Sequence, residues 1–564
     1  MRWLIGLAFP AVLFAGDAAP VTGALLSCDA WPRAVDLRTW TGDVLRISGT
    51  AQGTETAQGK AFFEWLRLFN RMAVGGMIQA YEGPYGKEAY VLDAHKTLFV
   101  YGWGYCDTTS RIAVAAWREY KQDPQAADRV ITQHDDGGYH TMYRLRMDGG
   151  HGAFDPRYGY YLVEKDAPDA RILDWKEVGD DAQFLKNKGY ANRSKPYFEI
   201  WGVEWERALL LQPGWFDSEA QWRAAGAPKE TVFGDSQYKM GTKFHDMSFT
   251  LWRGTTIERH WDNSARKFYR PAGKHTEREK PFLPAGRFYR VTEKSLDGNW
   301  PKHDPNYQRA RAYLSVVPRG EGYEGEGEKS IGQAWGVLRY RPILGKSEGL
   351  DAVLPGRSLT QAGTAPFLRP AKPEEGGEAV FDFRCPYVLV DGTLEVELAG
   401  AGARMEMRTL GAKRLSAQEA DAWSEWEVVA QGAGRHSVEL GRPRFDGKRK
   451  SIHGLYRFQV RMVVDAEQQR KTAAGLSGLK LDLIFENGIM SIPQIFAGRN
   501  TMRFRVGAAA QLQKAVEVEY RYQSEAGAKS VKHVLNPGDF KGNEGVWTMD
   551  APGLLRCDSV SVSY

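Results

Sequence analysis

One of the four cysteines in this chain, Cys106, lies where a thiol would be reactive. A turn that contains Gly102 and Gly104 precedes it, and the apolar stretch 112–117 follows it. This pattern predicts a loop that ends in the first turn of a helix. Unpaired N–H groups and the positive end of the helix dipole favour the thiolate there, and the thiolate is the attacking species. Cys106 is therefore a candidate nucleophile.

A histidine and an aspartate follow in an order that suits such a nucleophile. His140 opens a stretch with apolar residues at alternate positions, and Asp155 closes the next stretch after the turn 148–150, which contains two glycines. The pattern predicts a β-hairpin whose pairing brings Asp155 within reach of the imidazole. His140 would then act as the general base and acid, and Asp155 would orient its ring.

The order of Cys106, His140 and Asp155 before Pro156 resembles the core of the transglutaminase-like superfamily. The lead-in also fits, with an expected helix over 60–73 and short apolar stretches at 90–92 and 97–98, while 117–121 departs from the usual helix ending. The resemblance covers roughly residues 55–165. It implies an α+β fold class, with a papain-like/transglutaminase-like N-terminal core, and a Cys-His-Asp triad that works through a thioester acyl-enzyme.

Other residues near this motif have weaker claims to a role. The backbone N–H of Cys106 is one natural oxyanion donor, and Trp103 could form a wall of the cleft, although packing explains a tryptophan in such a turn equally well. His134 and His151 are expected to be solvated. A buried cysteine can also be a plain small apolar residue, so a scaffold that has lost catalysis is the alternative.

Composition places the chain among ordinary globular proteins. It has 564 residues, 43% of them hydrophobic and 26% charged, which is enough for several domains. The net charge of +5 is spread over the whole length, so no nucleic-acid partner is expected. No His/Glu or Cys/Cys pattern with metal-ligand spacing is present, and we expect neither a metal nor another cofactor.

The N-terminus predicts export. Arg2 precedes a short apolar run, and small residues follow at 16–18, as in a cleaved signal peptide over 1–19. The protein is therefore expected to be secreted or periplasmic, with no integral membrane segment after signal cleavage. The stretch before Cys28 resembles a lipoprotein cleavage box only faintly, because Asp17 and Pro20 interrupt the apolar run, and we expect no lipidation.

Hydrophobic patterns divide the rest of the chain into modules. The core is expected over 20–165, and β-rich modules follow it, including jelly-roll-like β-sandwich domains in the C-terminal part, because strands of period two recur there. The expected boundaries are a mixed α/β then β-rich module at 166–363, a linker at 364–378, a β-sandwich at 379–490 and a C-terminal β module at 491–564.

Two functions of different class follow. The first is a secreted cysteine peptidase or amidase with a peptide or protein substrate, whose β modules could dock a polysaccharide or cell-envelope polymer. Hydrolysis is the default over transamidation because water needs no dedicated site. The second is a non-catalytic carbohydrate-binding or adhesion protein on a transglutaminase-like scaffold.

The remaining thiols raise the question of a disulfide. An exported protein meets an oxidising environment, where Cys385 and Cys557 could form a bridge between the last two modules. Nothing in the sequence sets the distance between them, and we expect two separate buried thiols, with the bridge as the alternative.

Overall fold

The computed structural model describes residues 20–72, 93–104, 106–133, 139–156, 160–161, 170–174, 214–215, 245–261, 333–372, 374–410, 423–441, 451–466 and 473–564. The expected signal peptide over 1–19 and the rival candidate His134 lie outside these residues.

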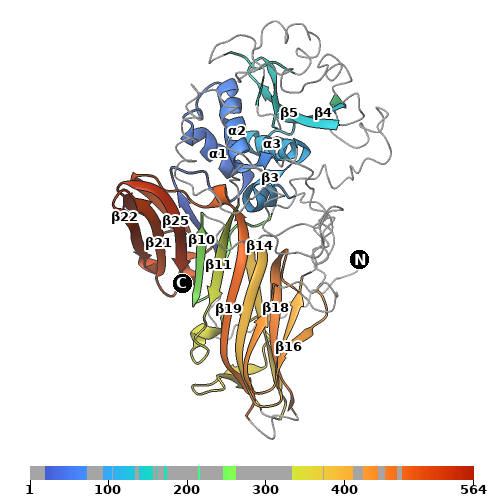
Figure 1. Ribbon diagram of the computed structural model, residues 1–564, viewed down its shortest axis with the longest axis vertical. Coiled ribbons are helices and arrows are strands. Elements are labelled where there is room, and N and C mark those ends of the chain that lie inside the picture. Colours follow the sequence, from blue (N-terminus) through green and yellow to red (C-terminus); the bar gives the residue numbers. More distant parts are fainter. Residues whose placement is uncertain are drawn as a thin grey trace, which may run out of the picture.

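Helices gather at one end of the elongated molecule (Figure 1). They are α1 (Leu37–Ile47), α2 (Glu55–Phe69), α3 (Cys106–Lys121) and the π-helical segment η1 (Lys96–Tyr101). The side chain of Asp36 caps α1 by accepting from the Thr39 N–H over 2.7 Å, and Thr54 caps α2 in the same way. These caps satisfy N–H groups that have no partner within the helix.

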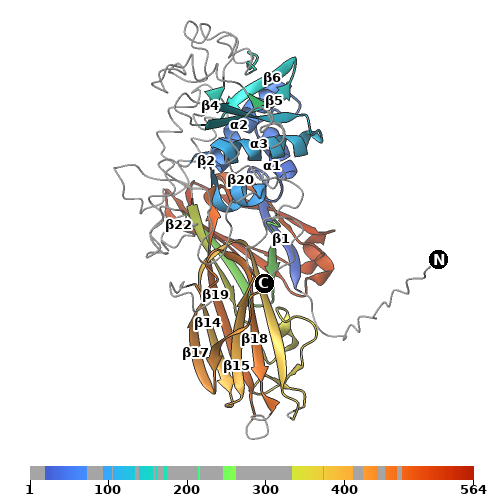
Figure 2. The same ribbon diagram turned by 90° about the vertical axis from the view of Figure 1, so that its right-hand side faces the viewer.

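A small antiparallel sheet packs beside these helices (Figure 2). Its strand order is β7 (Tyr160–Tyr161), β6 (Gly150–Asp155), β5 (Tyr139–Met147), β4 (Ala127–Gln133) and β8 (Gly214–Trp215). The expected hairpin is confirmed, since β5 pairs with β6 and Met147 lies opposite Gly150. Gly149 adopts a φ of 78° in the turn, a conformation that glycine reaches without strain.

Most of the remaining strands form one long sheet, which continues from residues 377–488 into the C-terminal module. The strand order is β16 (Glu427–Gln431), β15 (Ala403–Thr409), β18 (Leu455–Val464), β14 (Gly377–Ala399), β19 (Gly475–Gly488), β11 (Gln333–Tyr340), β10 (Thr255–His260), β25 (Leu554–Ser563), β21 (Val516–Ser524) and β22 (Gly527–Leu535), with β12 (Leu359–Gln361), β13 (Leu368–Pro370) and β17 (Gly434–Glu439) joined at its side. Burial alternates along many of these strands, as sequence patterns of period two require.

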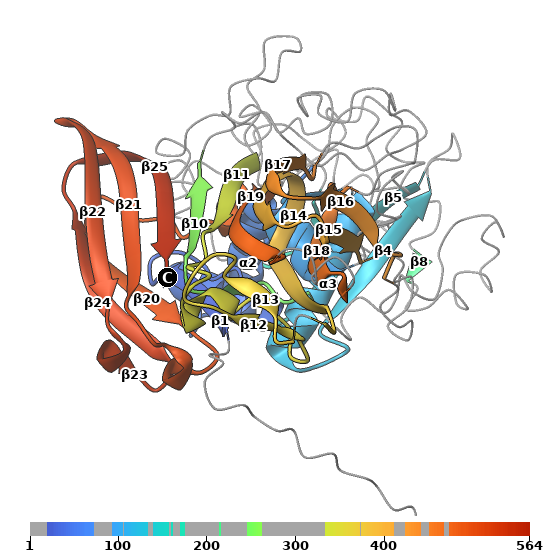
Figure 3. The same ribbon diagram turned by 90° about the horizontal axis from the view of Figure 1, so that it is seen from below.

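A second sheet links the two ends of the sequence (Figure 3). Its order is β23 (Phe540–Lys541), β24 (Glu544–Ala551), β20 (Gly498–Arg505), β1 (Val21–Cys28) and β9 (Phe249–Leu251). Thus β1, from the part of the chain where an N-terminal core is expected, is hydrogen-bonded into the C-terminal module. Short elements complete the fold: β2 (Arg71–Met72), β3 (Trp103–Gly104), η4 (Ser347–Leu350), η5 (Ile489–Ser491), η6 (Ala509–Gln511) and η7 (Pro537–Asp539).

The expected fold class is wrong. The described residues are mostly strand, arranged in sheets, and only three α-helices are present among them, so the chain is a β-rich protein rather than an α+β protein with a papain-like/transglutaminase-like core. The expectation gave too much weight to a short stretch around Cys106. Alternating patterns, which favour strands, extend over far more of the sequence.

The three cysteines whose side chains the structure describes are unpaired. Cys28, Cys385 and Cys557 are free and buried, so the expectation of separate thiols at Cys385 and Cys557 is confirmed and the bridge is not formed. Burial raises the pKa of Cys28 to about 11 and the pKa of Cys385 and of Cys557 to about 12. These thiols are therefore neutral and shielded at ordinary pH.

Candidate functional site

The backbone that leads into Cys106 is held by contacts between three segments. Asn70, at the end of α2, is 2% exposed, and its Oδ1 accepts from the Thr109 hydroxyl over 2.6 Å. Its Nδ2 donates to the carbonyl of Thr97 in η1 over 3.2 Å. Gly102, with a φ of 69°, then ends η1 and turns the chain into β3. Asn70 thereby ties α2, η1 and the first turn of α3 together.

The first turn of α3 is also fixed against the small sheet. The Ser110 hydroxyl donates to the carbonyl of Thr141 in β5 over 3.3 Å, and both residues are buried. Further along α3, the apolar residues Ile112, Ala113 and Trp117 are fully buried. The helix therefore packs its apolar side inward while its N-terminal turn is held at the start of β5.

Charged side chains fix the far end of the helix to the same sheet. Arg118 donates to the carbonyl of Ala127 over 2.8 Å and lies 3.3 Å from a carboxylate oxygen of Asp128. That carboxylate also accepts from Arg144 Nε over 2.8 Å. Since both arginines bond one partly buried aspartate, helix and sheet are held in one orientation.

The candidate triad lies around this junction as far as the backbone shows. Cys106 is the first residue of α3 and thus one helical turn before Ser110. His140 directly precedes Thr141 in β5 and pairs with Thr132 of β4. Asp155 ends β6, one residue after the Phe154 that pairs with Tyr143 of β5. The fold therefore brings the helix start and the two neighbouring strands together, while the side chains of these three residues lie outside the described part of the structure.

The two remaining sequence candidates give no further support. Trp103 opens the two-residue strand β3, which pairs with Arg71 of β2, and its side chain is likewise outside the described part. His151, on β6 opposite Arg146, is partly buried rather than fully solvated. Burial and the nearby positive charge of Arg144 lower its pKa, so it is a neutral ring near pH 7.

The described residues contain neither a cluster of metal-ligating side chains nor a membrane-spanning helix. No group of three or more His, Cys, Asp or Glu side chains there could hold a metal ion. No described helix is long and apolar enough to cross a membrane. The expected absence of a cofactor stays a prediction.

Tryptophan and arginine side chains, which could form a sugar-binding surface, cluster around β15 and β18 of the long sheet. Arg408 lies 4.8 Å from the ring centroid of Trp423 and 4.4 Å from that of Trp426. Arg457 stacks on Trp423 and Arg461 on Trp426, at 5.1 and 4.4 Å. On the neighbouring strand, Arg408 pairs with Gln459, which lies midway between Arg457 and Arg461. Guanidinium groups and rings therefore alternate in one stack. The ring surfaces that a sugar would need are used within the protein.

No described Trp, Phe or Tyr side chain is exposed elsewhere, since the exposed large apolar residues are Ile343, Val428, Val534, Val546 and Leu555. Polysaccharide docking through the β modules stays a prediction.

Comparison with known proteins gives only partial structural likenesses. No family model and no curated protein matches the chain. A β-glucuronidase from Bacteroides uniformis matches at 13% identity over 32% of this chain and 22% of its own, with a TM-score of 0.12. A family 2 glycosyl hydrolase from Bacteroides cellulosilyticus matches at 11% identity over 37% of this chain and 30% of its own, with a TM-score of 0.12.

A glycoside hydrolase domain of Endo-D from Streptococcus pneumoniae matches at 8% identity over 41% of this chain and 33% of its own, also with a TM-score of 0.12. The chain thus covers about a third or less of each of these proteins. None of them assigns a family or an activity to it.

Proposed function

We propose that this chain is a cysteine hydrolase that cleaves peptide or amide bonds through a thioester acyl-enzyme. Cys106 is the nucleophile, His140 the general base and acid, and Asp155 the group that orients the imidazole. The single observation that carries the proposal is the hydrogen bond from Ser110 to Thr141, which holds the turn that begins at Cys106 next to the residue that follows His140.

The position of Cys106 in α3 supports its role as nucleophile. A thiol at the first residue of a helix meets free N–H groups and the positive end of a dipole, which stabilise the thiolate. The three described thiols are buried, and their pKa values are raised. Cys106 is thus the cysteine of this chain whose backbone setting favours ionisation.

The reaction follows from these roles. The sulfur of Cys106 attacks the substrate carbonyl carbon, and His140 takes up the thiol proton. The carbon–nitrogen bond then breaks, the leaving amine receives that proton from His140, and a thioester remains. Water attacks the thioester and gives a proton to His140, and the thiol recovers a proton as the acid leaves. The N–H of Cys106 can donate to the oxyanion in both steps.

We propose water as the acceptor and a peptide or protein amide as the substrate. Transfer to an amine would need a site that excludes water and admits a lysine side chain, and nothing in the described residues supports one. The signal-like sequence over 1–19 supports action outside the cytoplasm.

Alkylation of the native protein tests the nucleophile directly. Iodoacetamide at pH 7 should modify Cys106 in the folded chain and leave Cys28, Cys385 and Cys557 unmodified until denaturant is added, as peptide mapping would show. Cys106→Ala should abolish native labelling, whereas the matched variant Cys385→Ala should retain it. Native labelling that persists in Cys106→Ala, or an unreactive Cys106 in the wild type, would refute the proposed role.

A further inference from the structure

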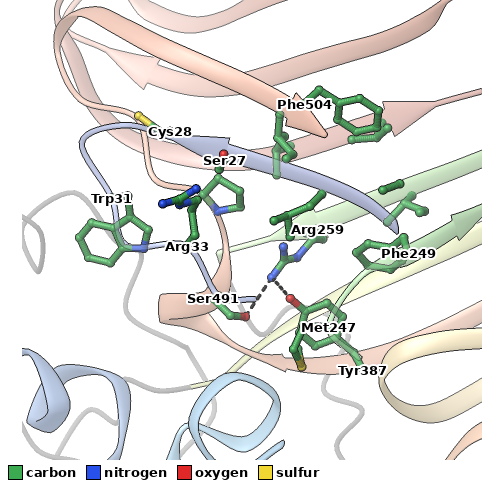
Figure 4. A pocket seen from close by; sticks show the side chains of 18 of the residues that line it. Ser27, Cys28, Trp31, Arg33, Met247, Phe249, Arg259, Tyr387, Ser491 and Phe504 are labelled. Atoms are coloured by element: carbon green, nitrogen blue, oxygen red, sulfur yellow. Dashed lines mark hydrogen bonds between the residues drawn. The ribbon is translucent and has the colours of Figure 1, made fainter. Parts of the chain in front are cut away.

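A cavity of about 40 Å³ lies between the long sheet and the second sheet, which contains β1 and β20 (Figure 4). Strands β1, β9 and β20 form one side of it, and β10, β14 and β25 form the other. Most of its lining is apolar, with Leu25, Phe249, Phe504 and Val560 as examples. A water needs about 10–15 Å³ of such space, so the cavity admits a guest of a few heavy atoms.

Two arginines line this cavity, and one of them has no carboxylate partner among the described residues. The guanidinium of Arg33 is paired with Asp43 over 2.7 Å, so its charge is already compensated. Arg259 of β10 is only 8% exposed, and its Nη2 donates to the Tyr387 hydroxyl and to the Ser491 hydroxyl, each over 2.9 Å. The Ser491 hydroxyl in turn donates to the carbonyl of Gly488 over 2.6 Å, which leaves its lone pairs for the arginine. No described residue accepts from Nε or Nη1 of Arg259, and Nε is fully buried.

The neighbouring strands supply no carboxylate to this guanidinium. Arg259 pairs with Gly336 and Val560, neither of which is charged. Glu258, the next residue in the strand, lies on the other face of the sheet, where it bonds Arg339. Glu486 also lies on that face, because it is in register with Trp335 and thus with His260.

The polar groups that do face Arg259 are neutral. Burial raises the pKa of Cys385 to about 12 and the pKa of Tyr520 well above its usual value. The Tyr387 ring lies 4.6 Å from the guanidinium carbon and offers a cation–π contact. Such a contact recovers only part of the free energy lost when a charge leaves water, so a buried cation ordinarily has an anionic partner.

We propose that Arg259 binds a small monovalent anion, a halide or a small carboxylate, in the cavity between the sheets. The anion accepts from Nη1, while Tyr387 and Ser491 accept from Nη2 and hold the guanidinium in place. Because Asp43 compensates the charge of Arg33, the cavity has one uncompensated positive charge, that of Arg259. A monovalent anion matches it, whereas a divalent anion would leave a negative charge uncompensated. Because β1 lines the cavity beside β20, the bound anion stabilises the contact between the two ends of the chain.

Thermal unfolding of the full chain in chloride-free buffer tests this proposal. At fixed ionic strength, the Tm should rise to a plateau with sodium bromide or sodium formate and show no saturable rise with sodium sulfate. Saturation at an about tenfold lower concentration of formate than of bromide identifies a carboxylate as the ligand, and the reverse order identifies a halide. Equal, non-saturating responses to all three salts would overturn the site.

Two variants and one crystallographic measurement complete the test. Arg259→Met should lose the saturable rise, and Arg435→Met, which removes a highly exposed arginine, should keep it. If Arg259→Met does not fold, anomalous scattering from bromide-soaked wild-type crystals decides. A bromide peak within hydrogen-bond distance of Nη1 supports the site, and bromide bound only at the surface rules it out.

Discussion

Ser110 and Thr141 are joined by a hydrogen bond of 3.3 Å from the serine hydroxyl to the main-chain carbonyl. The two residues are 0% and 5% exposed, so water does not readily replace this contact. Each of them is close in sequence to a candidate catalytic residue, Cys106 or His140. The bond therefore holds the start of α3, where Cys106 lies, against the strand that contains His140.

Ser110→Ala should weaken both stability and thiol reactivity. Loss of the donor leaves a buried carbonyl without its side-chain partner and should cost about 1 kcal/mol of unfolding free energy. The rate of Cys106 alkylation should fall as well, because the first turn of α3 is less well fixed. Urea unfolding and iodoacetamide kinetics measure the two effects. Thr108→Ala, on the same turn and half-buried, is the control, and an alkylation rate unchanged in Ser110→Ala contradicts the positioning role.

Substitutions in the triad should reduce turnover in a graded series. Cys106→Ala should abolish amide hydrolysis and His140→Ala should come close, because each removes a group that takes part in bond making or proton transfer. Asp155→Asn should retain a weakened activity, since the imidazole remains but its tautomer is no longer enforced. Amine release from peptide amide substrates measures the series. Wild-type activity in Cys106→Ala would end the enzyme interpretation.

His453 should make the fold less stable in acid. Burial lowers its pKa to about 4, and its Nδ1 is hydrogen-bonded to the carbonyl of Val390 over 2.9 Å. Because the folded pKa lies below the unfolded value of about 6.5, the unfolded chain binds the extra proton between these values. The free energy of unfolding is therefore independent of this histidine above pH 6.5 and falls by about 3 kcal/mol as the pH drops to 4.

Urea unfolding of the wild type and of His453→Gln between pH 4.5 and 7.5 measures that slope. The variant should show a flatter dependence on pH, whereas His436→Gln, at a half-exposed histidine on β17, should keep the wild-type slope. Identical slopes in the wild type and in His453→Gln would show that other groups cause the acid sensitivity.

Asp351→Asn should be strongly destabilising. The Asp351 carboxylate accepts from Arg253 Nε over 2.8 Å and from Arg253 Nη2 over 2.6 Å, and both side chains are buried. The neutral amide leaves the arginine without its counter-charge, which should cost about 3–5 kcal/mol. Glu375→Gln, in an exposed pair with Lys372, should change stability by less than about 1 kcal/mol. Denaturant midpoints at pH 7 provide the comparison, and equal shifts in the two variants would contradict it.

Local patterns in the sequence were sufficient to predict several elements. The hairpin between His140 and Asp155 follows from alternating apolar residues around a turn with two glycines, and the helix that begins at Cys106 follows from a glycine turn before an apolar stretch. These signals depend on neighbours a few residues apart, so they can be recognised without knowing the rest of the fold.

The fold class and the partners of distant strands depended on tertiary structure. Strand β1 pairs with β20, so that Leu25 lies opposite Arg505, and no local pattern indicates which of many similar strands will be the partner. The partners of Arg259 are likewise invisible in the sequence, where it is one charged residue in a strand of alternating pattern. Only the packing of the two sheets buries its guanidinium beside Tyr387 and Ser491. Side-chain alternation specifies which face of a strand is buried, whereas long-range packing decides what that face meets.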